Sequence, residues 1–438
     1  MSGNVSRYLS AVGEATEEYD SELLANLLKL DDRVVPGGWD FVDYLKSRSP
    51  LDIQKWCRNK VRPPFDKIVE NHLQCIHHAS KKEHIQAMSL QKKKFEMFLE
   101  VYKSEGSWLT QVMYTLILDT RKLAMLADRD EQSRGGKGDN EHLVDAKRLF
   151  DSCFRFTIMG RATTEDGVKK RAGALFIVIN QFKVYFKLGT LQLCKNLIRS
   201  VNQPNFPKFE SFPVSHRVTY KFYVGRIKVL EDDMAEADKH LTYALEHCHK
   251  EYHGNIRRIL EYLIPVKLIL GYLPDEELLK RQELSHLSGL VKCVKIGDVR
   301  KLSEELERNQ HLYISKGLYL SLDRLKVIAY RNLIRAVVSI HQENVKADAT
   351  QKATNAQRVP LRMLVNPFKR YGDSDLLELA EDKKDDSGVS IQIMDQIKCI
   401  LSNLIFKGYV KGYISHEKSF LVLSANQPFP PVKNGRLF

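Results

Sequence analysis

The feature that most constrains this sequence is a rhythm of short amphipathic segments that repeats along much of the chain. In residues 84–102, apolar side chains recur at spacings of three, four and seven, while Lys93 and Lys94 fall on the other side. That period is typical of an α-helix with one buried face. Turns such as residues 271–274, which contain glycine and proline, separate successive segments. The sequence therefore predicts an all-α protein, an α-solenoid of tetratricopeptide-like helix pairs.

The rhythm has one clear break near the end of its first third. An N-terminal helical region is expected over residues 1–127. Residues 128–140 are charged and contain three glycines, so we interpret them as a mobile loop that has little to bury. A solenoid of helical repeats is then expected over residues 141–342. Its helices are predicted at residues 141–158, 168–187, 190–201, 214–230, 234–250, 254–270, 275–285, 287–294, 299–309 and 318–341.

One helix pair in this array can be interpreted in detail. Gly225 has no side chain, so it favours the close approach of a neighbouring helix. Residues 231–233 are acidic and are expected to form the turn and the cap of the next helix. Small and apolar residues then face back toward the first helix, namely Ala237, Leu241, Ala244 and Leu245. This arrangement is typical of a tetratricopeptide hairpin, although the sequence does not match the full consensus.

The pattern changes after residue 342. Residues 343–438 are expected to form a winged-helix module with a preceding linker. The linker is residues 343–358, and residues 381–388 form a second polar loop. The module's elements are predicted as a short helix at 358–369, an amphipathic helix at 390–407, and strands at 408–414 and 419–423. Two helices followed by a hairpin at the end of a helical array are typical of a winged helix.

The distribution of charge indicates which end of the chain meets a polyanion. The net charge is +13, but residues 1–140 carry 21 basic and 21 acidic residues, so the whole excess lies in the rest. After Asp395 only Glu417 opposes the basic residues Lys398, Lys407, Lys411, Lys418, Lys433 and Arg436. A nucleic-acid partner for the C-terminal end is one explanation. A basic surface that serves only solubility is the other.

The predicted wing carries the clearest functional signal. Gly408 can end the preceding helix with a positive φ, and Gly412 suits a strand that another backbone approaches closely. The aromatic residues Tyr409, Tyr413 and Phe420 can anchor the hairpin. Lys407, Lys411, His416 and Lys418 crowd the helix end and the wing. Winged helices contact nucleic-acid phosphates through such groups, but many only pack against partner subunits. The sequence of the wing fits both interpretations.

Several functional classes are not expected from the sequence. No apolar run reaches the roughly 18 residues that a membrane span needs, and the polar N-terminus is unlike a signal peptide. Seven cysteines without CxxC spacing fit reduced core thiols in an intracellular protein. His249 and His253 lack the converging partners of a structural zinc site. We find no catalytic motif and expect neither an enzyme nor a cofactor.

Several stretches together resemble a known family. They are residues 176–199, 220–249, 255–274, 330–337 and 407–430, of which the last is KGYVKGYISHEKSFLVLSANQPFP. Helix pairs that run into a C-terminal winged helix resemble the PCI domain, here over about residues 214–430. The combination is similar to the PCI-domain-containing proteins of the Thp and signalosome-twelfth-subunit-like group, subunits of the second transcription-and-export complex. The similarity covers nearly the whole chain and is weakest before residue 60 and at residues 128–140.

The resemblance implies a non-catalytic scaffold subunit that couples transcription to mRNA export. It implies a nuclear location that includes the nuclear pore, with some protein in the cytoplasm, and a hetero-oligomeric complex without membrane contact. The implied partners are a Sac/GANP-type scaffold protein, a small acidic Sem/Dss-type subunit, and RNA or DNA. The alternative is a purely structural PCI subunit of a signalosome or proteasome-lid type assembly.

The same resemblance implies which residues carry these contacts. Two winged helices of PCI proteins form a joint nucleic-acid platform. On this chain the corresponding residues would be Lys398, Lys407, Lys411, Lys418, Lys369 and Arg370. A protein interface is expected at the aromatic residues of the wing, Tyr409, Tyr413 and Phe420. No catalytic residue and no metal ligand are expected.

Overall fold

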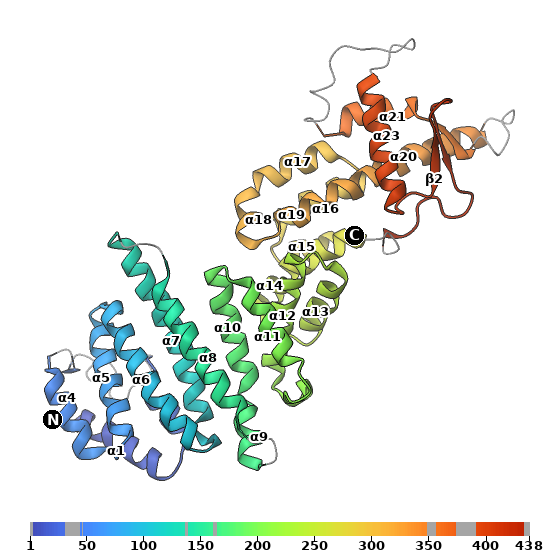
Figure 1. The fold of residues 1–438 in the computed structure, drawn as a ribbon. Helices are drawn as coiled ribbons and strands as arrows, with labels where there is room; N and C mark the ends of the chain where they lie inside the picture. Colours follow the sequence, from blue (N-terminus) through green and yellow to red (C-terminus); the bar gives the residue numbers. More distant parts are fainter. Residues whose placement is uncertain are drawn as a thin grey trace. The chain divides into compact units, whose positions relative to one another are not determined.

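The computed structural model describes residues 3–30, 44–45, 47–135, 139–160, 164–347, 356–373 and 391–432. Most of these residues are helical, which confirms the all-α class (Figure 1). The chain forms two compact units, Met1–Tyr223 and Val224–Phe438. The division falls inside a helix, α12 (Val214–Leu230), rather than at either of the polar breaks in the sequence. None of the helices in the described ranges is long and apolar enough to cross a bilayer.

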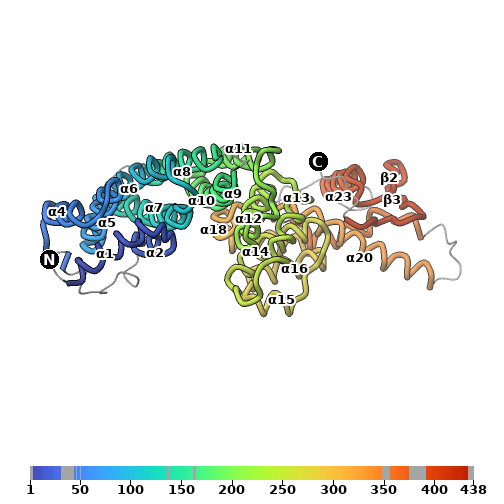
Figure 2. The backbone as a smooth tube through the Cα atoms, turned by 90° about the horizontal axis from the view of Figure 1, so that it is seen from below, coloured from blue at the N-terminus to red at the C-terminus, as the bar shows by residue number. Residues whose placement is uncertain are grey.

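Unit 1 is a succession of helices in which neighbours along the chain pack side by side (Figure 2). Its elements are α1 (Gly3–Glu17), α2 (Ser21–Leu27), α4 (Pro50–Lys60), α5 (Phe65–Ser80), α6 (His84–Ser104), η1 (Ser107–Leu109), α7 (Thr110–Ser133), α8 (Glu141–Ile158), α9 (Glu165–Arg171), α10 (Ala174–Leu188), α11 (Leu191–Val201), η2 (Phe209–Ser211) and the start of α12. Its core is aromatic, with Phe95, Phe98, Phe150 and Phe182 fully buried. The rings of Phe95 and Phe150 meet edge to face with centroids 6.2 Å apart. The apolar face of residues 84–102 is therefore confirmed as a core face, but Lys94, expected on the other side with Lys93, is fully buried.

The predicted loop at residues 128–140 begins too early. Helix α7 continues to Ser133, and the carboxylate of Asp128 is buried. It accepts hydrogen bonds from the backbone N–H groups of His142 and Leu143, at 2.9 and 3.1 Å. Charge in this stretch thus serves to cap the first turn of α8 rather than to stay in solvent. Residues 136–138 lie outside the described residues.

Unit 2 continues the helical series and ends in a small sheet (Figure 1). Its elements are the rest of α12, α13 (Met234–Glu246), α14 (His253–Ile269), α15 (Glu276–Arg281), α16 (Ser285–Ile296), α17 (Val299–Arg308), α18 (Gln310–Lys316), α19 (Tyr319–Asp323), α20 (Leu325–Ala347), β1 (Arg358–Pro360), α21 (Arg362–Tyr371), α23 (Ile391–Phe406), β2 (Gly412–Ser415) and β3 (Phe420–Leu423). Five of the seven cysteines are buried, as expected for core thiols.

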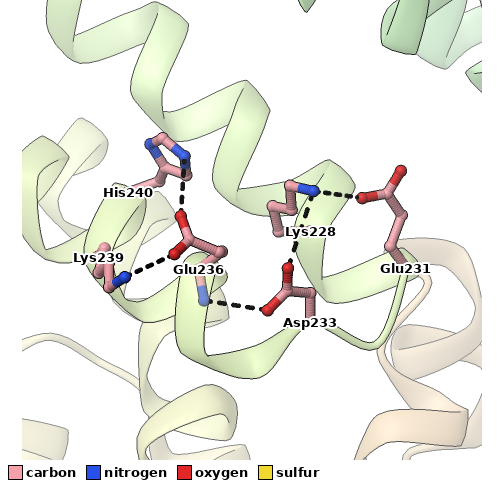
Figure 3. A network of polar contacts seen from close by, with 6 residues as sticks. All are labelled: Lys228, Glu231, Asp233, Glu236, Lys239 and His240. Carbon is pink, nitrogen blue, oxygen red and sulfur yellow. Dashed lines mark hydrogen bonds and ion pairs between the residues drawn. The ribbon is translucent and has the colours of Figure 1, made fainter.

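The α12–α13 pair confirms the predicted hairpin. A Cβ on Gly225 would lie 2.6 Å from Cγ of Leu241, so only glycine lets the two helices approach this closely. Asp233 caps α13 by accepting a hydrogen bond from the backbone N–H of Glu236 at 3.2 Å. Lys228 spans the turn and pairs with Glu231 at 2.8 Å and with Asp233 at 3.8 Å (Figure 3). The acidic step thus both ends one helix and starts the next.

The C-terminal elements form the predicted winged helix, with one strand more than expected. The sheet is antiparallel in the order β1-β3-β2. The helix expected over residues 358–369 begins only at Arg362, because the residues before it form β1. Pro360 disfavours the helical conformation of Val359, which favours an extended start. The expected linker at 343–358 is shorter than predicted, since α20 runs to Ala347. Residues 348–355 and the polar loop 381–388 lie outside the described residues.

Candidate nucleic-acid interface

Helix α23 positions the first basic side chain of the site. Its buried face carries Ile393, Met394, Ile397, Leu401 and Leu404, the period predicted from the sequence. The last helical residue is Phe406, and Gly408, two residues later, has a φ of 74°, which confirms the predicted left-handed end. The backbone N–H of Tyr409 then donates to the carbonyl of Leu404 at 2.9 Å. This sharp stop places half-buried Lys407 directly after the last helical residue and before the wing.

The β2–β3 hairpin positions the next two basic side chains of the site, Lys411 and Lys418. Gly412 lies opposite Leu423, and a Cβ at this position would overlap the carbonyl oxygen of Val422. The close backbone approach predicted at Gly412 is therefore confirmed. Lys411 directly precedes β2, and Lys418 lies in the turn at its far end, where both are exposed. Since β2 spans three residue steps, these two positions flank roughly 10 Å of strand.

The other predicted contact residues differ in how accessible their charges are to a phosphate. Lys398 lies in the middle of α23 and pairs with Asp395, with Nζ 3.2 Å from the carboxylate and 24% of the lysine side chain exposed. Lys369 and Arg370 are exposed at the end of α21, whose contacts include α23. The guanidinium of Arg370 lies over the ring of Tyr371, 5.6 Å from its centroid. The strongest group is thus Lys407, Lys411 and Lys418, which have no ion-pair partner within the described ranges.

The three aromatic residues of the wing divide into two kinds. Tyr409 is only 4% exposed, and burial raises the pKa of its hydroxyl. This is at odds with the predicted role of Tyr409 in a protein interface and fits the expectation that it anchors the hairpin. Tyr413 is 64% exposed, and Phe420 is half-buried at the start of β3. These two side chains retain surface that a partner can contact.

Two features of the module escaped the sequence reasoning. Buried Arg331 on α20 donates from Nη2 to the carbonyl of Pro430 at 2.8 Å, and burial lowers its pKa. The backbone N–H of Lys411 donates to the carbonyl of Pro428 at 2.8 Å. The C-terminal segment is therefore bound both to α20 and to the wing. Strand β1, with exposed Arg358, was the second omission, and the signal that could have revealed it is Pro360.

The histidine-rich stretch at residues 246–253 does not form the metal cluster found in the described part of the chain. The convergent group there is Asp128, Glu131 and His142, whose ligand atoms lie within 4.8 Å of one another. Both carboxylate oxygens of Asp128 already accept backbone hydrogen bonds. That cluster is accounted for by helix capping in unit 1.

Comparison with known proteins decides the family. No protein-family model matches the chain, but it is 34% identical to PCI domain-containing protein 2 of Xenopus laevis over 98% of each chain. The chain belongs to the PCI domain-containing protein 2 family. PCI domain-containing protein 2 homolog of Drosophila melanogaster is 32% identical over 99% of this chain and 100% of its own. Protein CSN12 homolog of Neurospora crassa is 28% identical over 74% and 72%.

Membership of the PCI domain-containing protein 2 family confirms the predicted PCI resemblance and the solenoid with a terminal winged helix. PCI-domain proteins are generally scaffold subunits, so the family also supports the coarser functional expectation. In this member of the family, the wing residues Lys411, Tyr413 and Lys418 are exposed and can be reached by a partner.

Proposed function

We propose that this protein is a non-catalytic scaffold subunit of a nuclear complex for transcription-coupled mRNA export, and that its winged helix contributes to a nucleic-acid-binding platform. The observation that carries the proposal is the group formed by Lys407 at the end of α23 and by Lys411 and Lys418 at the two ends of β2. No acidic side chain within the described residues pairs with them. Lysines held without partners beside an ordered wing are available to phosphates.

The proposed partners follow from the resemblance and from charge. We place this chain beside a Sac/GANP-type scaffold protein and a small acidic Sem/Dss-type subunit, in the nucleus. The net charge of +13 favours association with acidic partners, whether protein or nucleic acid, because complementary potentials steer encounter. Copurification of the tagged full-length protein from nuclear extract, with identification of the associated chains, tests this part of the proposal. Recovery of signalosome or lid subunits instead would contradict it.

A second candidate is a purely structural subunit of a signalosome-type assembly. The relative named Protein CSN12 homolog favours it, as do the exposed ring of Tyr413 and the position of β2 at the edge of the sheet as described. An edge strand offers unpaired backbone groups that another chain can extend. In that case the wing lysines would be of little consequence for assembly.

Exchange of Lys407, Lys411 and Lys418 for glutamate separates the two candidates. If all three contact phosphates, most nucleic-acid binding should be lost, and the slope of log affinity against log salt should fall by about 2–3, at roughly 0.7–0.9 per contact. Fluorescence anisotropy at several salt concentrations measures both quantities. Folding should survive, since exposed charge changes cost within about 0.5 kcal/mol each.

The matched control is the same exchange at Lys55, Lys60 and Lys93, which are exposed on unit 1. It changes the net charge equally, so any non-specific electrostatic loss appears in both variants. Equal effects of the two triple variants would remove the wing from the binding site. Unchanged affinity in the wing variant, together with loss of a partner protein in a pull-down, would favour the structural subunit.

A further inference from the structure

The register of the small sheet places particular side chains in rows across its outer face. Arg358, Val422 and Tyr413 are direct cross-strand neighbours, and so are Pro360, Phe420 and Ser415. Side chains alternate between the two faces of a strand, so both rows lie on the same face. The opposite face carries Val359 and Leu421, which are fully buried.

The outer face is open rather than packed. Tyr413 is 64% exposed, Arg358 is exposed, and Phe420 and Val422 are half-buried. An outer face of an antiparallel sheet is ordinarily polar, but here the exposed surface includes two aromatic rings. Tyr413 and Phe420 are diagonal neighbours on β2 and β3, and such pairs are roughly 7–8 Å apart. Each ring can therefore take a separate flat ligand.

The charges around these rings are basic. Lys411 precedes Tyr413 by two residues and its carbonyl accepts a hydrogen bond from the backbone N–H of Ser424 at 2.9 Å, so Lys411 continues the same face. Arg358 ends the Tyr413 row on β1. Aromatic rings on an open antiparallel sheet, flanked by cations, are what single-stranded nucleic acids bind, with bases on the rings and phosphates on the cations.

We propose that the outer face of the β1-β3-β2 sheet is a stacking platform for unpaired bases, with Tyr413 and Phe420 as the rings and Arg358 and Lys411 beside the phosphates. This inference rests on the nucleic-acid binding proposed above and adds its substrate class, single-stranded RNA or DNA. Paired bases inside a duplex present no free face to a ring, so the platform discriminates against double strands. The phosphate contacts of Lys407 and Lys418 do not discriminate between single and double strands.

The test uses the full-length protein and two fluorescent probes of equal length, a 12-nucleotide oligouridylate and a duplex of mixed sequence. Y413A should weaken binding of the single strand by about 5- to 150-fold, the range for loss of one stacked base. Binding of the duplex should change by less than about twofold, since electrostatic contacts remain. Y413F keeps the ring and should bind the single strand like the parent protein.

The matched control is Y252A, because Tyr252 is 63% exposed in the same unit but lies at the start of α14 rather than on the sheet. It should leave both affinities unchanged. Circular dichroism and the melting temperature of each variant establish that the fold is retained.

The outcomes separate this inference from the proposed function. If the parent protein binds both probes and the wing-lysine variant loses both, but Y413A binds the single strand normally, the platform is wrong and the proposed function stands. Equal weakening of single strand and duplex by Y413A also overturns the platform. Loss of a partner protein from Y413A without a change in affinity would assign the ring to a protein interface. If the parent protein binds neither probe, both proposals fail.

Discussion

Replacement of Gly412 by alanine should disrupt the wing more than the same replacement at Gly408, the other described glycine beside the hairpin. The new Cβ would overlap the carbonyl oxygen of Val422 on β3, and a backbone atom cannot rotate away as a side chain can. Overpacking against movable side chains costs typically 1–3 kcal/mol. Because this obstruction is backbone, we expect about 3 kcal/mol. For a unit of this size that corresponds to a fall in melting temperature of about 6–12 °C.

Thermal denaturation and amide hydrogen exchange together measure this effect. The melting temperature gives the loss of stability, and exchange shows whether the amides of residues 412–415 and 420–423 lose protection, as separation of β2 from β3 requires. The binding affinity for a single-stranded probe should fall as well, since Tyr413 lies on the displaced strand.

Two other glycines serve as controls for the added methyl group. Gly408 has φ of 74° and nothing within 4 Å of a Cβ, so G408A should cost only the left-handed strain, about 1–2 kcal/mol. Gly254 in α14 is equally open without that strain, and G254A should cost nothing. If G412A melted within 1 °C of the parent protein and kept its amide protection, the close approach at Gly412 would not exist in solution.

Three further predictions test other parts of the structure. R331M removes the donor to the carbonyl of Pro430 and should cost about 1–3 kcal/mol, with faster exchange in residues 424–430; unchanged exchange there would show that the tail is held otherwise. G225A would place its Cβ 2.6 Å from Leu241 and should cost about 1–3 kcal/mol, and combining it with L241A should cost less than the sum of the two, whereas strict additivity would argue against the contact. Burial, and then the charge of Lys94, lower the pKa of His72 below 6.5, so the unfolded chain binds more protons below that pH. Unit 1 should therefore lose stability as the pH falls from 7 to 5, by at most about 1.4 kcal/mol per pH unit. In thermal melts at several pH values, the melting temperature of H72Q should depend less on pH than that of the parent protein. Identical slopes would refute this.

Helices and their turns were predictable because their causes are local. Gly225, Gly408 and Gly412 each stand where the backbone needs a residue without a side chain, and the apolar period of α23 fixes its buried face. The helix pair at α12 and α13 could be interpreted to the level of its cap, since Asp233 acts on a backbone N–H three residues away.

What escaped prediction depends on partners distant in the sequence. Asp128 resembled part of a solvated loop, and only the position of α8 shows that it is a buried cap. Strand β1 has three residues and exists because β3 pairs with it. Likewise, composition could not distinguish Tyr409, which packs inward, from Tyr413, which faces out. Each tyrosine follows a Lys-Gly pair, so the local sequence does not distinguish them.

The C-terminal segment has a consequence for how the protein can be divided. Residues 424–432 lie after the last strand, yet two of their carbonyl groups accept hydrogen bonds from elsewhere in the unit. The carbonyl of Pro428 accepts from the backbone N–H of Lys411, and that of Pro430 accepts from Arg331 on α20. Val432 reaches the turn after α14, where a Cβ on Gly271 would meet it. A fragment that begins at the polar linker lacks Arg331 and Gly271, so this segment would keep the bond to Lys411 and lose its other two contacts. The smallest autonomous piece that retains a native wing therefore has to start upstream of α14 and keep the chain through Val432.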